Sequence, residues 1–195
     1  PTVEPSSPSS PAPDGAFVVA HLGAIGEGRD LAPAIAAVST LRAEGLDVRL
    51  LLAGRTGIAP PEHDGVVATG PLDHAALSRT LAGAGAYLFA EPTGPTSRKT
   101  SLLSALAHGL PIVAYAGPDA EPHFRDEENL LLVQPDAGSI ASALRRLAGD
   151  GALRERLGAA AGRLAAQRYS WRTIAETVRT AAAEAAAGPR QRTGA

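Results

Sequence analysis

The sequence has 195 residues, a formal net charge of −2 and 45% hydrophobic residues, which suits one globular domain with tails. The absence of cysteine excludes disulfides and thiolate metal sites, and the near-neutral charge argues against a general nucleic-acid or anionic-membrane surface. The excess of Arg, Ala, Gly and Pro is typical of a GC-rich genome, so the single lysine, Lys99, stands out. Because the chain starts at Pro1 and contains no Met, we expect a piece of a longer protein.

The two ends of the chain differ in composition from its middle. Residues 1–15 are rich in Pro and Ser and predict a disordered linker, whereas residues 188–195 predict a flexible tail. A folded domain is therefore expected over residues 16–187. No apolar run reaches the roughly 18–20 residues of a membrane span, and the first residues do not have the pattern of a signal peptide.

Short apolar runs in the middle of the chain alternate with longer amphipathic ones. The apolar runs predict strands at 16–20, 48–53, 65–69, 86–90, 111–115 and 130–133. The amphipathic runs predict helices at 31–42, 73–82, 97–108, 137–147, 153–168 and 171–187. This alternation predicts an α/β fold, a Rossmann-like, doubly wound, mostly parallel six-stranded sheet with helices on both faces. Ligands of such sheets bind beyond the carboxyl ends of the strands, so the loops at 21–29, 54–58, 91–97 and 116–121 are the candidates.

A basic pair follows the fourth predicted strand. Arg98 and Lys99 would lie in the first turn of the helix at 97–108, where the helix dipole disfavours cations. No acid occurs from residue 92 to residue 118, so the pair predicts a bound anion such as a phosphate.

Hydroxyl groups surround this basic pair. Thr96, Ser97 and Thr100 are suitable donors to phosphate oxygens. The alternative is that both basic side chains are solvated and that Thr96 or Ser97 only caps the helix.

The loop after the first predicted strand is rich in glycine. Gly23 would let the backbone approach a ligand, and Arg29 precedes the next helix. The glycine spacing is not the dinucleotide fingerprint, and no acid stands where that fingerprint places one to hold a ribose, which counts against an NAD site.

Other residues carry weaker signals. The five histidines show no metal-ligand spacing on one helix, so no metal site is expected, and His108 is expected to contact the carbonyls at its helix end. Gly117 and Glu121 follow the fifth strand and could reach a ligand. Trp171 is expected to anchor the last helix by packing, with Ser170 as the helix cap.

The order of these motifs resembles a known family. The glycine-rich loop is followed by VRLLLAGR, VVATGPL, AYLFA, the basic helix start, SALAHGLPIVAY, ENLLLVQPD and RYSW. This order resembles the C-terminal, nucleotide-sugar-binding domain of GT-B glycosyltransferases of family 4, the group 1 enzymes. The resemblance covers roughly residues 16 to 180, and ALAHGLPIVA followed by ENLLLV is its most specific part.

The resemblance implies where a donor would bind. It places the two acids of the family's E-x7-E motif at Thr96 and Ser104, and neither residue is acidic here. The residues implied to contact the donor diphosphate are Arg98, Lys99, Ser97, Thr96, Gly23 and Arg29. Those implied to lie near the donor sugar and nucleoside are Gly94, Thr100, Ser104, Gly117 and Glu121. No residue is assigned a catalytic role.

The function implied is that of the donor-binding half of a cytoplasmic glycosyltransferase. Such an enzyme transfers a sugar from a nucleoside diphosphate sugar to an acceptor, with retention and without a metal or cofactor. The acceptor-binding N-terminal domain would be missing from this chain, residues 153–187 would cross to it, and the isolated chain would be inactive. Two alternatives stay open, a non-catalytic nucleotide-binding or interaction module and half of a sugar-nucleotide epimerase.

Overall fold

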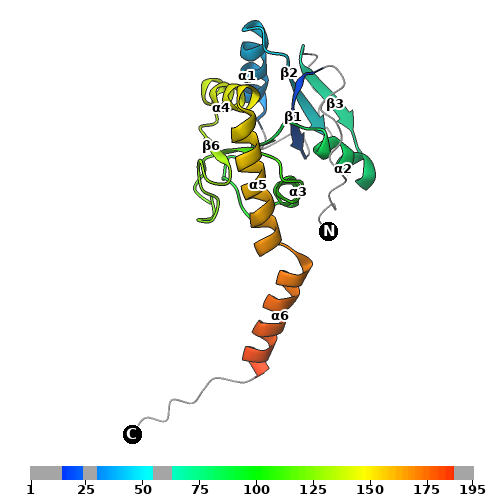
Figure 1. The fold of residues 1–195 in the computed structure, drawn as a ribbon, viewed down its shortest axis with the longest axis vertical. Helices are drawn as coiled ribbons and strands as arrows, with labels where there is room; N and C mark the ends of the chain where they lie inside the picture. The colour runs from blue at the N-terminus through cyan, green and yellow to red at the C-terminus, as the bar shows by residue number, and fades with distance from the viewer. Residues whose placement is uncertain (1–14, 24–29, 55–62, 187–195) are drawn as a thin grey trace.

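A computed structural model describes residues 15–23, 30–54 and 63–186 (Figure 1). Its strands form one parallel six-stranded sheet in the order β3-β2-β1-β4-β5-β6. The strands are β1 (Phe17–Leu22), β2 (Val48–Ala53), β3 (Val66–Gly70), β4 (Ala86–Phe89), β5 (Ile112–Tyr115) and β6 (Leu131–Val133). The helices are α1 (Ala32–Ala43), α2 (His74–Ala82), α3 (Thr100–Ala107), α4 (Ala137–Gly149), α5 (Gly151–Arg168) and α6 (Trp171–Ala186). The predicted doubly wound fold is confirmed.

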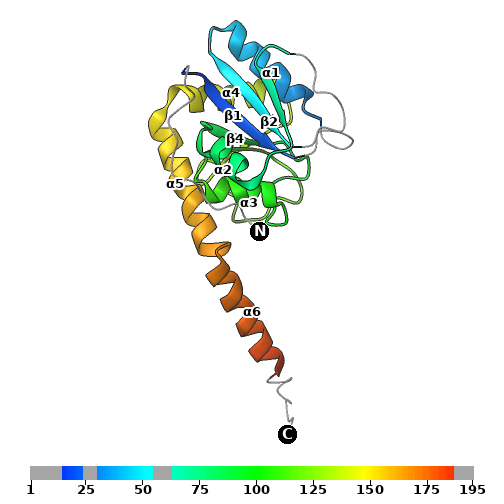
Figure 2. The ribbon, with the colours of Figure 1, turned by 90° about the vertical axis from the view of Figure 1, so that its right-hand side faces the viewer.

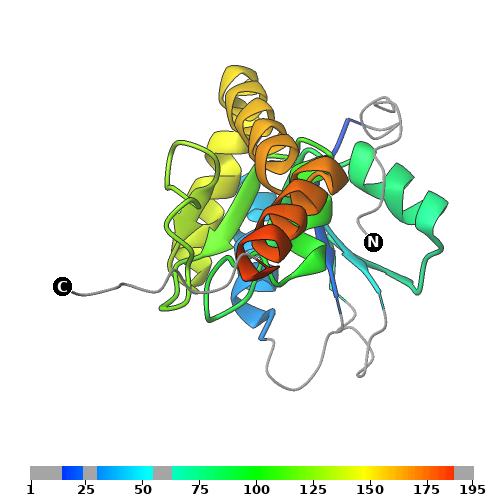
Figure 3. The ribbon, with the colours of Figure 1, turned by 90° about the horizontal axis from the view of Figure 1, so that it is seen from below.

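Helices cover both faces of the sheet (Figures 1 and 3). Helices α1 and α4 pack on one face, where the core includes Leu41, Leu88 and Leu144. Helices α2 and α3 and the end of α5 pack on the other, where the core includes Tyr87 and Leu102. The central strands are continuously apolar because both of their faces are buried, as expected for a parallel sheet.

The strand order places a switch point between β1 and β4. The chain moves outward from β1 to β2 and β3 and then returns to β4, on the other side of β1. The connections after β1 and β4 therefore run in opposite directions and leave a crevice at the carboxyl ends of these strands. The imidazole of His21 spans this point, with its Nδ1 3.0 Å from the carbonyl oxygen of Leu88.

Two predicted helix caps are confirmed. The Asp73 carboxylate accepts a hydrogen bond from the amide of Ala76, and the Ser170 hydroxyl accepts one from the amide of Thr173. His108 also lies as predicted, with its Nδ1 2.8 Å from the carbonyl oxygen of Ser104 near the end of α3.

The predicted packing of Trp171 is wrong. Its side chain is 68% exposed, and Ile174 and Val178 on the same face of α6 are also exposed. Figures 1 and 2 show α6 leading away from the body of the domain, so the apolar stripe has little to pack against. The predicted linker 1–14 and tail 188–195 lie outside the described residues.

One strained residue is held by ion pairs. Glu127, between β5 and β6, has a φ of 60°, an uncommon value for a residue other than glycine. Its carboxylate accepts two hydrogen bonds from Arg146, at 2.7 and 3.0 Å, and its carbonyl oxygen accepts one from Arg156. The hydrogen bonds from Arg146 lower the pKa of Glu127 below its ordinary value of 4.5.

We expect Glu127→Gln to be less stable than the wild type at pH 7, by no more than about 1 kcal/mol because the ion pair is half-exposed. A lowered folded-state pKa stabilises the fold above the unfolded-state pKa, and this contribution is lost as the pH falls through the folded value. The difference in melting temperature between the two proteins should therefore shrink from pH 5 downward and vanish in stronger acid. A difference that stays constant over this range would contradict the assignment.

Candidate functional site

The predicted basic helix start is a turn that precedes the helix. Helix α3 begins at Thr100, so the prediction that Arg98 and Lys99 lie in its first turn is wrong. Residues 96–99 form a turn closed by the amide of Lys99 and the carbonyl oxygen of Thr96 at 3.3 Å. We call these four residues the basic turn.

The two cations of the basic turn have different surroundings. The Lys99 ammonium lies 2.8 Å from the Glu91 carboxylate, which is only 13% exposed, so its charge is compensated. The Arg98 side chain is exposed, and within the described residues it makes no ion pair or hydrogen bond. Arg98 is thus the cation of the turn that is available to an incoming anion. The prediction from the sequence considered acids only from residue 92 onward and so left out Glu91, the residue directly before that stretch.

A carboxylate from another loop holds the basic turn. Glu121 Oε1 accepts hydrogen bonds from the amide of Ser97 at 3.1 Å and from its hydroxyl at 2.8 Å. Glu121 therefore occupies donors that had been assigned to a phosphate and acts as the cap of this turn. The neighbouring Thr96 is only 3% exposed, and its hydroxyl has no partner among the residues that the structure describes.

The loops after β4 and β5 approach each other through their backbones. A Cβ on Gly117 would overlap backbone atoms of Pro92, Thr93 and Gly94, and Gly94 has a φ of +90°. The amide of Asp119 donates to the Thr93 carbonyl oxygen at 2.8 Å. The two loops therefore form one support for the basic turn, and the predicted pair Gly94 and Gly117 lies together for this structural reason.

The other wall of the crevice comes from β1 and β2. The amide of Gly23, at the end of β1, donates to the Ala53 carbonyl oxygen at 3.1 Å. Gly54 packs so closely that a Cβ on it would lie 2.8 Å from the Gly23 carbonyl oxygen. The predicted Arg29 and the predicted loop 54–58 beyond Gly54 lie outside the described residues.

A cavity of about 320 Å³ opens between this wall and α3. Apolar side chains form part of it, and hydroxyl groups of α3 form another part. Its lining residues are Leu22, Gly23, Ala53, Gly54, Leu72, His74, Leu77, Thr100, Ser101 and Ser104. It thus brings together three predicted residues, Gly23, Thr100 and Ser104, whereas the basic turn, Gly94, Gly117 and Glu121 do not line it.

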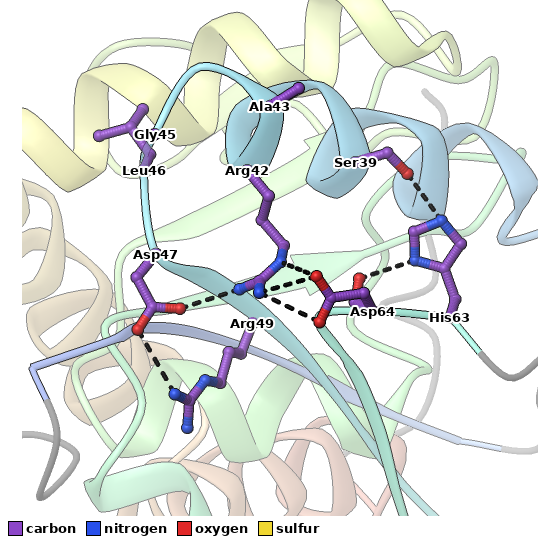
Figure 4. A pocket seen from close by; sticks show the side chains of 9 residues that line it. All are labelled: Ser39, Arg42, Ala43, Gly45, Leu46, Asp47, Arg49, His63 and Asp64. Atoms are coloured by element: carbon purple, nitrogen blue, oxygen red, sulfur yellow. Dashed lines mark hydrogen bonds and ion pairs between the residues drawn. The ribbon is translucent and has the colours of Figure 1, made fainter.

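A larger cavity, of about 630 Å³, lies beside the end of α1 and the amino ends of β2 and β3, away from the crevice (Figure 4). Its charged groups pair with one another, because Arg42 bonds both Asp47 at 2.9 Å and Asp64 at 3.0 Å. His63 Nε2 likewise lies 2.8 Å from the Ser39 hydroxyl. This cavity offers less to an anionic ligand than the crevice does. Among the described residues, no group of three His, Asp or Glu side chains could hold a metal ion.

The fold agrees with the comparison with protein families. The family model described as "Glycosyl transferases group 1" matches residues 16–150, from the start of β1 to the end of α4. The chain belongs to the group 1 glycosyl transferases. A comparison with curated proteins finds no match. None of the helices within the described residues is long and apolar enough to cross a membrane.

Solved structures of similar fold include proteins longer than this chain and one C-terminal domain. HepE of Anabaena, in complex with UDP, superposes with a TM-score of 0.74 at 17% identity, over 87% of this chain and 49% of HepE. Sucrose-phosphate synthase of Thermosynechococcus elongatus gives 0.66 at 21% identity, over 91% of this chain and 49% of the synthase. The C-terminal domain of LpcC, a group 1 glycosyl transferase protein of Francisella tularensis, gives 0.65 at 19% identity, over 80% of this chain and 87% of that domain.

The glycosyl transferase chain thus spans about half the length of HepE and of the synthase. The identities are low, so these likenesses establish the fold, while the family rests on the match over residues 16–150.

Proposed function

We propose that this chain is the donor-binding half of a glycosyltransferase that takes its sugar from a nucleoside diphosphate sugar. The observation that carries the proposal is Arg98, an exposed cation without a partner among the described residues, beside the N-terminus of α3 at the sheet's switch point. A diphosphate there would receive a charged hydrogen bond from Arg98 and would lie near the positive end of the helix dipole.

The cavity beside α3 suits the nucleoside. Leu72 and Leu77 offer apolar contact to a flat base, whereas Thr100, Ser101 and Ser104 offer hydroxyl groups to a ribose. The Ser104 hydroxyl already donates to the Thr100 carbonyl oxygen at 2.9 Å, so it would serve a ribose mainly as an acceptor. The bound UDP named for HepE supports a nucleoside diphosphate as the ligand class.

The expected reaction is transfer of the sugar to an acceptor with retention and without a metal. Arg98 and the helix N-terminus would stabilise the charge that develops on the leaving diphosphate. Lys99 would contribute once the anion competes with Glu91 for it. The unmatched half of HepE supports a further domain that supplies the acceptor site, so the isolated chain should bind donor but transfer little sugar. A cytoplasmic location stays a prediction.

A non-catalytic nucleotide-binding or interaction module is the second candidate. The positions where the resemblance implies two acids hold Thr96, which is buried, and Ser104, which bonds the backbone. A site without these acids could bind a nucleotide without transferring a sugar. Joining the chain to the remainder of its protein and measuring turnover separates the two candidates.

We expect calorimetry with UDP, GDP, ADP and TDP to show binding of at least one diphosphate, and Arg98→Ala to weaken it by about 1.5–3 kcal/mol, which is 10- to 150-fold. Arg163→Ala is the matched control, because Arg163 is also exposed but lies on α5. The Arg163→Ala protein should bind the diphosphate with the affinity of the wild type. If all three proteins bind with equal affinity, Arg98 does not contact the diphosphate. If no diphosphate binds, the donor-binding proposal is wrong.

A further inference from the structure

A short turn after β5 contacts two distant parts of the molecule. Residues 121–124, which we call the bridge turn, are closed by a 2.9 Å hydrogen bond from the Phe124 amide to the Glu121 carbonyl oxygen. The Glu121 side chain reaches Ser97 in the basic turn, as described above. The His123 side chain reaches in another direction, and its Nε2 lies 2.5 Å from the Tyr169 hydroxyl.

The contacts of the bridge turn are partly buried and fixed on several sides. His123 is 17% exposed, and its ring stacks at a tilt on Phe124, with centroids 4.4 Å apart. Its carbonyl oxygen accepts a 2.8 Å hydrogen bond from the Asn129 side chain. Glu121 Oε2 lies 3.3 Å from the same Nε2 that meets Tyr169. Because Glu121 and His123 belong to the same closed turn, a shift of its backbone would move both side chains.

Tyr169 stands at the junction of the last two helices. It is the C-cap residue of α5, with its amide donating to the Ala165 carbonyl oxygen at 2.8 Å, and the next residue, Ser170, caps α6. Burial raises the pKa of the Tyr169 hydroxyl to about 12, so the hydroxyl keeps its proton at neutral pH. Burial together with Arg168 lowers the pKa of His123, so a neutral imidazole can accept that proton in a hydrogen bond.

We infer that the bridge turn couples the basic turn to the α5–α6 junction, with Glu121 and His123 as positioning residues. The inference concerns the regulation of the proposed donor site and rests on the proposed function for that role. An anion that displaces the Ser97 donors from Glu121 would shift the bridge turn and thereby the hydrogen bond to Tyr169. Linkage makes this coupling reciprocal. If anion binding changes the equilibrium constant for the direction of α6 by some factor, then fixing α6 in that direction changes the affinity of the basic turn for the anion by the same factor.

A double-mutant cycle tests the coupling without any ligand. Among the described residues no hydrogen bond joins Ser97 to Tyr169, so Ser97→Ala and Tyr169→Phe should be additive unless the bridge turn connects them. We expect the double variant's melting temperature to differ from the additive value by about 2 °C or more. Thr173→Val is the control partner for Ser97→Ala, because its hydroxyl is also at the junction but bonds Ser170, and this cycle should be additive. Additivity in both cycles overturns the inference.

Trp171 gives a second readout. It is the single tryptophan of the chain, it is exposed, and it lies two residues after Tyr169, so its emission reports the junction. With the diphosphate that binds in calorimetry, we expect a shift in Trp171 emission or anisotropy in the wild type. Tyr169→Phe should lose this shift while its affinity changes less than about 3-fold. Binding that leaves Trp171 unchanged in the wild type overturns the coupling, whereas absence of binding counts against the proposed function and leaves the cycle to decide the coupling.

Discussion

Replacing Gly117 with alanine is expected to destabilise the protein by about 3 kcal/mol, the upper part of the range for overpacking, and to abolish diphosphate binding. The added Cβ would overlap three backbone groups, those of Pro92, Thr93 and Gly94. A flexible side chain could move aside, but these groups are backbone, and the Thr93 carbonyl oxygen is held by the Asp119 amide. The loops after β4 and β5 would have to separate, and the basic turn would lose its support.

The matched control for this change is Gly149→Ala. Gly149 ends α4, has no positive φ, and has nothing within 4 Å of an added Cβ. Because alanine favours a helix over glycine by up to about 1 kcal/mol, this variant should be as stable as the wild type or slightly more stable. Urea unfolding and calorimetry measure both effects. A Gly117→Ala protein with wild-type stability and affinity would show that the two loops do not pack as described.

Leu102→Ala is expected to cost about 2–5 kcal/mol, the usual range for a leucine truncated in a core. The Leu102 side chain is fully buried and lies in the first turn of α3, so it fixes that turn on the sheet. The cavity left behind would also loosen the wall formed by Thr100 and Ser104. We therefore expect weaker diphosphate binding at temperatures where the variant is still folded.

Leu103→Ala is the neighbouring control, because Leu103 is only partly buried against the same core. Its truncation should cost less than half as much as that of Leu102. Guanidinium unfolding at 25 °C measures both free energies. Equal losses at the two positions would mean that α3 is rotated about its axis relative to the orientation described.

The sheet could be predicted because the sequence patterns that indicate each strand and helix lie within that segment itself. Strands such as β4 and β5 are runs of buried residues between glycine- or proline-containing loops, and helices such as α4 have a clear amphipathic period. Asp73 identified the start of α2 in the same way, as a side chain that caps an amide three residues further on.

The basic turn could not be predicted because its partners are distant in the sequence. Thr96 and Ser97 looked like the local cap of a helix, but the group that caps Ser97 is Glu121, 24 residues away. Lys99 looked uncompensated, but Glu91 reaches it across the loop. The local sequence pattern indicates on which element a charged residue lies. Its ion-pair partner depends on the tertiary structure.

Trp171 illustrates a related limit. Its sequence context, an aromatic residue directly after a serine cap, is the same whether the helix packs on its own domain or not. The stripe formed by Trp171, Ile174 and Val178 has an ordinary helical spacing, and only the direction of α6 leaves it exposed.

The ion pair between Lys99 and Glu91 has a consequence for the kind of anion that the proposed donor site would select. Glu91 would compete with an incoming anion for Lys99, so the affinity for that anion would be reduced by the energy needed to separate Lys99 from Glu91. A singly charged anion can replace this attraction only in part, whereas the several charged oxygens of a diphosphate can engage Arg98 and Lys99 together. The carboxylate that pairs with the lysine would thereby discriminate among ligands by their charge.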